Sequence, residues 1–293
     1  MSIVFTRGQG TGTDTRRVRG GRARAAITPA TIVSALVLLI AIAWALVPGL
    51  FTHFDPNDGG NTPALLAPSL EHWFGTDHYG RDIFARVIYG ARITLLIGFG
   101  ATAISALIGT AIGTTSAYLG GKADAVITRI LDTWMAIPSL LVTLALIAGI
   151  GRGLPQTIAA LAVGGIPGFS RILRAAALDV VNRDYMEAVR ALGASRKRAV
   201  FKHVVPNVMS QVLIQATSSV SGNILLGATL SFLGLGAQPP APEWGYMLAE
   251  GIDNYQFYSY LVSIPGLAIA ITALAINILG DALRDALDPR LKK

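Results

Sequence analysis

The chain has 293 residues, of which only 14% are charged, and its mean hydropathy is +0.54. A water-soluble protein of this size carries about a quarter charged residues, so most of this chain cannot face water. Several uninterrupted apolar runs are each long enough to cross the hydrocarbon layer as a helix. Because these runs are continuous rather than alternating, they favour an all-α polytopic membrane protein over a β-barrel.

The formal net charge is +7, and the chain contains no cysteine. The lack of cysteine excludes a disulfide framework, a thiol nucleophile and a thiolate metal site. The basic residues do not gather in one groove with interleaved aromatic residues, which argues against binding to nucleic acid. We therefore expect this chain to contact membrane lipid and not to bind nucleic acid.

Six apolar segments are expected to span the membrane, at residues 28–50, 88–119, 127–150, 155–178, 207–236 and 258–281. With the N-terminus inside, twenty basic residues fall on the inner side and four on the outer side. Basic residues mark cytoplasmic loops, so both termini are predicted to be cytoplasmic. Prolines within or beside the spans predict kinks at residues 138, 155, 167 and 265. Small residues four apart, at 109 and 113 and at 164 and 168, predict close helix packing.

The first 26 residues are polar and rich in glycine and arginine, which predicts a disordered cytoplasmic tail. Arg16 and Arg17 resemble a twin-arginine signal, but the long apolar run that follows favours a role in setting topology. The remaining organisation is a first transmembrane helix with an outer loop at 27–87, a five-helix core at 88–281 containing a hairpin at 183–206, and a cytoplasmic tail at 282–293.

The segment 183–206 is a basic helix–glycine–helix hairpin between two apolar spans. Glu187 lies near the start of the first helix, where a carboxylate complements the helix dipole. Gly193 permits the backbone conformation that commonly ends a helix, and Ser195 can cap a second helix running to His203. Pro206 suits the first turn of the following span. We expect a short helix held rigidly across the inner membrane face.

This hairpin resembles the cytoplasmic signature of the permease subunits of type I ABC importers. That signature is E-A-A, three residues, G, nine residues, then I-x-L-P. The present chain has Glu187-Ala188-Val189, Gly193 and the sequence HVVP at 203–206, with the same spacing. Three positions depart from the signature, at Val189, His203 and Val205, and they affect packing detail only.

The resemblance extends to the C-type subunit of the dipeptide, oligopeptide and nickel branch of these permeases. Four further motifs occur in the family's order: GTDHYGRD at 75–82, IYGARIT at 88–94, SFLGLGAQPP at 231–240 and GDALRDALDPRL at 280–291. This similarity covers the chain from about residue 70 to its end. It implies the type I importer permease fold and the import of di- or oligopeptides across a bacterial inner membrane. Nickel chelates, glutathione or another small solute are the alternative cargoes.

The resemblance further implies a division of labour among subunits. The hairpin would dock on a cytoplasmic ATPase through Glu187, Ala188, Ala191, Leu192, Gly193, Ala194, Ser195, Arg196, His203 and Pro206. The expected partners are a homologous permease, two ATPase subunits or domains, and an extracytoplasmic solute-binding protein. The one Gly-Lys pair, at 121–122, is followed by alanine, so the chain lacks G-x-x-x-x-G-K-[ST]. We therefore expect ATP and magnesium on partner subunits, and no catalytic residue, cofactor or metal in this chain.

Acidic and aromatic residues in the outer loop 237–257 are candidate contacts for the binding protein: Glu243, Trp244, Glu250 and Asp253. The aromatic residues also suit the interfacial belt of a membrane protein. Asn223 and Asn277 lie at mid-span depth, where interhelical hydrogen bonding is favoured over lining of the pathway.

Two weaker sequence patterns and two alternative functional classes have less support from the residues. Histidines 53, 72 and 78 share an outer loop with acidic residues 55, 71 and 77, but their irregular spacing favours surface residues over a metal site. The GFGATA sequence at 98–103 lies in an apolar span without a preceding strand, so it predicts helix packing rather than nucleotide binding. A secondary transporter would need ionisable residues at mid-membrane depth, and the spans have almost none at their centres. An intramembrane enzyme would need catalytic groups, which the chain lacks.

Overall fold

The computed structural model describes residues 28–60 and 62–287, so the predicted N-terminal tail and the last six residues lie outside the described part. Within the described part the chain is helical and forms no strand, with one isolated antiparallel bridge between Thr76 and Asp82. The long helices are α1 (Pro29–Leu46), α2 (Ile83–Leu119), α3 (Gly121–Met135), α4 (Ser139–Ile150), α5 (Leu154–Val181), α9 (Met209–Phe232) and α11 (Tyr260–Leu287). The predicted all-α fold is confirmed.

Within residues 28–60 and 62–287, four helices are long and apolar enough to cross a membrane, namely α1, α2, α5 and α11. Helices α3 and α4 form a fifth candidate together, bent by 86° at the break that contains Pro138. The kink predicted at this proline is therefore confirmed. Helix α9 has 24 residues but carries serine, threonine and amide side chains throughout. The six-span count and the inner placement of both termini remain predictions.

Helices α2, α3, α5 and α11 extend beyond their expected ends. Helix α2 begins at Ile83 rather than at residue 88, because Asp82 caps it: its Oδ1 accepts a 2.6 Å hydrogen bond from the Ala85 N–H. At the other end of the chain, α11 continues to Leu287, so the tail expected from residue 282 begins as helix.

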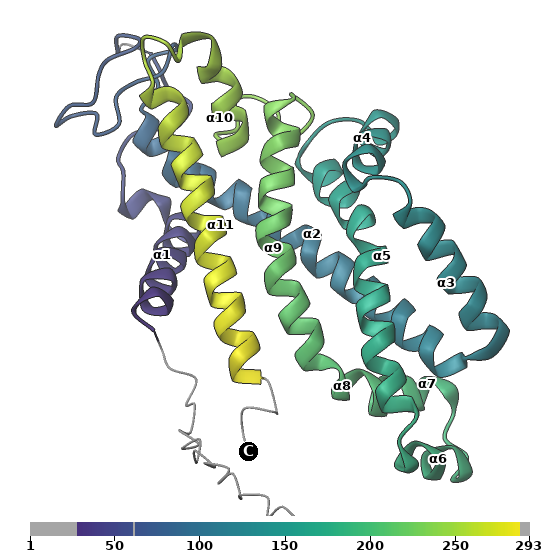
Figure 1. Cartoon of the computed structure of the whole chain (residues 1–293). Helices are drawn as coiled ribbons and strands as arrows, with labels where there is room; N and C mark the ends of the chain where they lie inside the picture. Colours follow the sequence, from purple (N-terminus) through teal and green to yellow (C-terminus); the bar gives the residue numbers. More distant parts are fainter. Residues whose placement is uncertain (1–27, 61, 288–293) are drawn as a thin grey trace, which may run out of the picture.

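Helices α2 and α5 form the centre of the molecule, where α2 crosses the bundle obliquely (Figure 1). The close approach expected at Gly109 and Gly113 occurs here. A Cβ on Gly109 would lie 2.4 Å from Cβ of Phe169, and one on Gly113 would lie 2.3 Å from the carbonyl oxygen of Ser170. Only glycine lets the two helix backbones pack at this separation.

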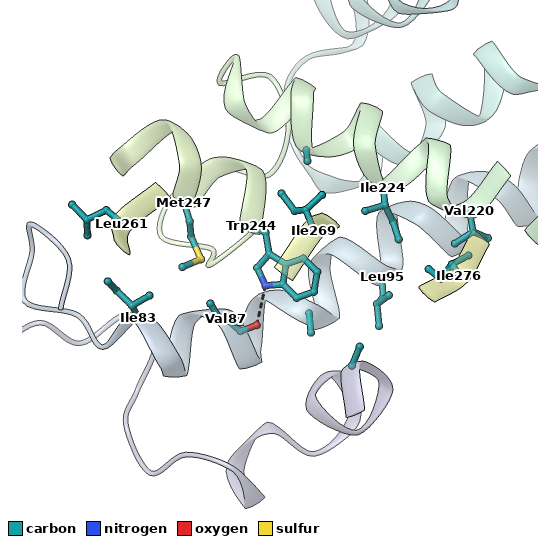
Figure 2. Close-up of a cluster of buried hydrophobic side chains, with 13 residues drawn as sticks. Ile83, Val87, Leu95, Val220, Ile224, Trp244, Met247, Leu261, Ile269 and Ile276 are labelled. Atoms are coloured by element: carbon teal, nitrogen blue, oxygen red, sulfur yellow. Dashed lines mark hydrogen bonds between the residues drawn. The ribbon is translucent and has the colours of Figure 1, made fainter. Parts of the chain in front are cut away.

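A second core joins α1, α2, α9 and α11 to the short helix α10 (Trp244–Gly251). Figure 2 shows Trp244 inserted between these helices, with its Nε1 donating a 2.9 Å hydrogen bond to the carbonyl of Val87. Ile224, Met247 and Leu261 pack in the same cluster. The core therefore fixes α10 onto the membrane-spanning helices.

The irregular segments lie at the two ends of the bundle. At one end, loop 51–82 meets α10 and the 3₁₀ turn η3 (Ile252–Asn254); we call residues 51–82 and 243–254 the outer cap. At the other end lie α6 (Asp184–Ala191), α7 (Arg196–Ala199), the π-helical segment η2 (Val200–Val204) and α8 (Val205–Asn207). We call residues 183–206 the inner hairpin. Figure 1 places α10 and α6 at opposite ends of the molecule.

Candidate functional site

The inner hairpin has the helix–glycine–helix geometry expected from the sequence. Gly193 has φ of +74°, and its N–H and that of Ala194 close the end of α6 by bonding to the carbonyls of Arg190 (3.0 Å) and Val189 (3.3 Å). Ser195 caps α7, since its Oγ accepts a 3.4 Å hydrogen bond from the Arg198 N–H. The turn therefore requires a left-handed residue at one position, and glycine occupies it.

The second helix of the hairpin differs from the sequence prediction. It is α-helical only over Arg196–Ala199 and then widens into the π-helical segment η2, where the Val205 N–H bonds to the carbonyl of Val200. Pro206 follows directly, and a proline cannot donate to the carbonyl four residues before it. A widened turn is one way for a helix to accommodate such a break.

Buried apolar side chains anchor the inner hairpin to the bundle. Met186, Ala199 and Val204 are fully buried in a cluster with Leu173 and other residues of α5. In addition, the Arg190 guanidinium lies 5.3 Å from the ring centroid of Tyr118 near the inner end of α2, within the range of a cation–π interaction. A displacement of the hairpin would therefore be transmitted to α2 and α5.

The outward face of the hairpin is exposed and contains large apolar side chains. Leu192 is 87% exposed and Phe201 is 59% exposed. The predicted docking residues gather on this surface: Glu187, Ala188, Ala191, Leu192, Gly193, Ser195, Arg196 and Pro206 are exposed, and Ala194 and His203 are half-buried. An exposed apolar patch with charged neighbours is typical of a protein contact, although docking itself remains a prediction.

An ion pair that sequence reasoning missed joins three helices near the inner end. Asp124, in the first turn of α3, accepts hydrogen bonds from both Nε (2.6 Å) and Nη2 of Arg174 on α5. The Ser116 hydroxyl of α2 donates to the same carboxylate at 2.6 Å. The two charged residues are 50 positions apart, and no local pattern in the sequence pairs them.

A cavity of about 410 Å³ lies between the α3–α4 bend, α5 and α9. Gln215, Ser219 and Asn223 of α9 line one wall, and Gly164 and Gly168 of α5 line another. A Cβ added to Gly164 would lie 3.3 Å from the Thr143 hydroxyl oxygen, whereas one added to Gly168 would meet nothing within 4 Å, so the close packing predicted for this pair occurs at Gly164 and not at Gly168.

The two mid-span asparagines are in different places. Asn223 lines the cavity, and its Nδ2 donates a 2.9 Å hydrogen bond to Thr102 Oγ1 on α2. Asn277 does not line this cavity; its Oδ1 accepts a 2.6 Å bond from the Ser221 hydroxyl, which joins α9 and α11. Interhelical hydrogen bonding, the favoured interpretation of both residues, is confirmed.

A buried ion network holds the outer cap. Arg81 Nε donates to Asp77 Oδ2 at 2.6 Å, and Arg81 Nη2 donates to Glu250 Oε1 at 2.9 Å. Arg86, which is 1% exposed, donates from Nη2 to Glu250 Oε2 at 2.8 Å. Burial acts to lower the pKa of Arg81, but its bonds to Glu250 and Asp77 outweigh burial and raise that pKa above its ordinary value. The network ties loop 51–82 to α10.

The prediction that the histidines and acidic residues of the outer loop are surface residues is confirmed for His53, Asp55 and Glu71, which are exposed, but it is wrong for His72 and Asp77. His72 is buried with its Nδ1 2.9 Å from Asp82 Oδ2, and Asp77 is buried against Arg81. Among residues 28–60 and 62–287, no group of three or more His, Cys, Asp or Glu side chains could hold a metal ion. Both side chains are buried because each has a charged partner nearby in the sequence, ten residues away for His72 and four for Asp77.

Two of the predicted binding-protein contacts are also buried, so they do not form an exposed surface. Glu243 is 0% exposed and caps α10, with Oε2 accepting a 2.9 Å bond from the Tyr246 N–H. Burial raises the pKa of Glu243, while hydrogen bonds from the backbone of α10 and from Thr94 oppose that rise. Trp244 is 1% exposed in the core described above. Both residues were predicted as surface contacts because a short acidic and aromatic loop gives no sign of its buried partners.

The other two candidates lie closer to solvent. Glu250 is half-buried and bonded to Arg81 and Arg86, whereas Asp253 is exposed. Of the four residues, Asp253 alone therefore has a side chain on the surface of the outer cap, and its role in binding remains a prediction.

Comparison with known proteins gives consistent results. Residues 105–293 match the family model described as "Binding-protein-dependent transport system inner membrane component". The chain is 41% identical to the probable D,D-dipeptide transport system permease protein DdpC of Escherichia coli strain K12, over 90% of this chain and 88% of that protein. It is 42% identical to the di/tripeptide transport system permease protein DppC of Pseudomonas aeruginosa, over 88% and 87% of the two chains.

A third relative has a different cargo in its name. The glutathione transport system permease protein GsiD of Escherichia coli O6:K15:H31 is 40% identical over 94% of this chain and 89% of that protein. Among solved structures, an inward-facing MetNI methionine ABC transporter aligns with a TM-score of 0.56 over 69% of this chain and 96% of that chain. At 21% identity this likeness concerns the fold alone.

Proposed function

Because the chain belongs to the family of binding-protein-dependent transport system inner membrane components, we propose that it is a permease subunit of an ATP-driven importer of di- and oligopeptides. In this role it forms one half of the translocation pathway in a bacterial inner membrane. It crosses that membrane six times, with both termini in the cytoplasm. The observation that carries the proposal is the exposed inner hairpin, which is anchored on α2 and α5 and presents Leu192 to solvent.

The inner hairpin is the coupling element of the proposed machine. Its apolar tip and basic flank dock into a groove of an ATPase subunit, where closure around ATP and magnesium moves the hairpin. Met186 and the Arg190–Tyr118 contact pass that motion to α5 and α2. The fold thus links two states of the motor to two states of the bundle. ATP hydrolysis takes place on the partner subunits, and this chain contributes no catalytic group to it.

The cavity is this chain's side of the pathway. It opens beside helix α5 and the bent α3–α4 pair, and the break between α3 and α4 allows the wall to change shape. A homologous permease encloses it from the other side. Asn223 remains a proposed pathway residue, whereas Asn277 is assigned to the contact between α9 and α11.

The outer cap faces the solute-binding protein that delivers cargo. Its buried ion network makes it a rigid platform, and Asp253 is the exposed acidic residue retained from the predicted contacts. Glutathione is the second candidate cargo, because a relative with that cargo in its name is 40% identical to this chain. Glutathione is itself a tripeptide, so the two candidates share amide chemistry.

The test is recovery of the machine and its activity. The tagged chain is purified from its native membranes in mild detergent, and the retained proteins are identified by mass spectrometry. The proposal expects a second permease and P-loop ATPases, and ATP-dependent peptide uptake once the complex is placed in liposomes with its binding protein. A chain that purifies alone and transports without ATP would contradict it and would indicate a secondary transporter.

A further inference from the structure

The cavity between α3–α4, α5 and α9 contains polar groups but no charge. Every residue in its lining is within the described part of the chain, and none of those side chains is ionisable. Asp124 of α3 and Arg174 of α5 are paired with each other outside the cavity lining. A solute in the cavity therefore meets hydroxyl, amide, backbone and apolar groups of this chain, but no charged side chain.

The polar groups form a ladder along α9. Gln215, Ser219 and Asn223 are four residues apart, which places them on one stripe of the helix. Gln215 Nε2 donates to Ser219 Oγ at 3.3 Å, and Asn223 Nδ2 donates to Thr102 Oγ1 at 2.9 Å. Each side-chain amide has two N–H donors and a carbonyl acceptor. Both amides therefore retain bonding capacity beyond these contacts.

The α5 wall opposite the ladder has little side-chain bulk. Gly164, Gly165 and Gly168 line the cavity, and nothing lies within 4 Å of the position of a Cβ on Gly168. Pro167, inside α5, lines the cavity as well. Because a proline has no N–H, the carbonyl of Val163 lacks its usual helical donor and is left as an acceptor. The wall thus offers space for a bulky side chain of the cargo.

We propose that the ladder of Gln215, Ser219 and Asn223 is the element that selects what may pass: it binds the amide groups of a peptide through neutral hydrogen bonds and does not discriminate by charge. This inference rests on the proposed function, since it names the chemistry by which the pathway recognises cargo. A fixed charge in a site of low dielectric would repel cargo of the same sign and hold cargo of the opposite sign. An uncharged ladder avoids both effects, so acidic and basic peptides pass at similar rates.

Substitution of Gln215 tests this directly, because glutamate has the same shape and adds a charge. Uptake of an acidic and a basic dipeptide is measured in liposomes containing the whole complex, with each peptide supplied on saturating binding protein. The wild-type ratio of the two maximal rates should lie within about threefold of one. Gln215→Glu should depress the acidic peptide about tenfold relative to the basic one, and Gln215→Arg, which stays charged at all relevant pH, should reverse the preference.

The matched control is Gln211→Glu, the same substitution one turn away on α9 and outside the cavity. It should leave the ratio of the two rates unchanged. If neither Gln215 variant shifts the ratio by more than about twofold, the ladder does not contact cargo and the inference is overturned, while uptake by the wild type still supports the proposed function. If the wild-type complex takes up neither peptide with ATP, the proposed function fails, and the selective role fails with it.

A second measurement needs no transport, because the chain has no native cysteine. Gln215→Cys and Leu213→Cys are each labelled in membrane vesicles with a cationic and an anionic water-soluble thiol reagent. Leu213 is 45% exposed on another side of α9 and is expected to face lipid, so its cysteine should react slowly. The cysteine at 215 should react with both reagents at rates within about threefold. The proposal of an uncharged aqueous cavity is overturned if the cysteine at 215 is as unreactive as that at 213. It is also overturned if the cysteine at 215 reacts more than about tenfold faster with one reagent than with the other.

Discussion

The outer cap and the inner hairpin are both irregular segments attached to the same bundle, but their side chains are satisfied in different ways. In the outer cap, Arg81 and Arg86 share Glu250 in a buried network, and Trp244 is inserted into the core. In the inner hairpin the charged residues face solvent and Leu192 is 87% exposed. The cap is therefore stabilised by contacts within the chain, whereas the hairpin presents a surface that a partner could complete. Damage to the cap should unfold the protein, and damage to the hairpin should uncouple it.

The largest effect is expected from Arg86→Met in the outer cap. This change leaves Glu250 with one partner in a buried site, and breaking such a pair costs about 3–5 kcal/mol. Thermal unfolding of the purified chain in detergent measures the loss. The control is Arg152→Met, since Arg152 is exposed. Equal unfolding midpoints for the two variants would show that the network does not stabilise the cap.

Gly193→Val should have a smaller effect on stability and a large effect on coupling. With φ of +74°, any residue with a Cβ is strained there by about 1–2 kcal/mol. We expect a hairpin of altered shape, with ATP hydrolysis retained and uptake lost in the reconstituted complex. Gly149→Val is the control, because Gly149 lies in helix α4 with nothing within 4 Å of a Cβ and no positive φ. A Gly193→Val complex that transports normally would refute the docking geometry.

Glu243→Gln tests the burial of the outer cap through the pH dependence of the free energy of unfolding. Burial raises the folded pKa of Glu243 above 4.5, so its contribution to stability is fully present below the unfolded pKa and is lost as the pH rises through the folded pKa. Glutamine does not titrate, so the variant should gain stability relative to wild type over that rise, by about 1.4 kcal/mol for each unit by which the pKa is raised. Chemical unfolding at a series of pH values measures the difference. A pH-independent difference between the Glu243→Gln variant and the wild type would contradict the burial argument.

Glu187→Lys should change stability least. Glu187 is exposed in the first turn of α6, so reversal of its charge costs about 0.3–1 kcal/mol through the helix dipole. The expected consequence is a lower yield of ATPase co-purified with the tagged chain. Normal yield together with normal uptake would remove Glu187 from the docking surface.

The difference between the two regions also explains what the sequence could predict. The inner hairpin was predictable because its determinants are local: Gly193 ends one helix and Ser195 caps the next within a few residues. The π-helical segment before Pro206 was not expected, although the proline itself was the signal. The same local reasoning correctly predicted the kink at Pro138 and the close packing at Gly109.

The outer cap could not be predicted in this way. Arg81 and Glu250 are 169 residues apart, and no spacing rule connects them. Glu243 and Trp244 were therefore expected on the surface, where acidic and aromatic loop residues usually lie, although both are buried. The cavity was equally hard to predict. Asn223 was predicted as a possible pathway residue, but Gln215 and Ser219 can be recognised as lining residues only once the packing of α9 against α5 is known.

The most direct test of the central claim uses two single cysteines in a chain that has none. Leu192→Cys places a thiol at the tip of the inner hairpin, and Leu70→Cys places one in the outer cap, where Leu70 is 98% exposed. Each variant is treated with a short bifunctional thiol cross-linker in native membranes, and the products are identified by mass spectrometry. The account predicts a cross-link from residue 192, and none from residue 70, to a P-loop ATPase. A cross-link to the ATPase from residue 70, or its absence at residue 192 in a complex that still transports, would contradict it.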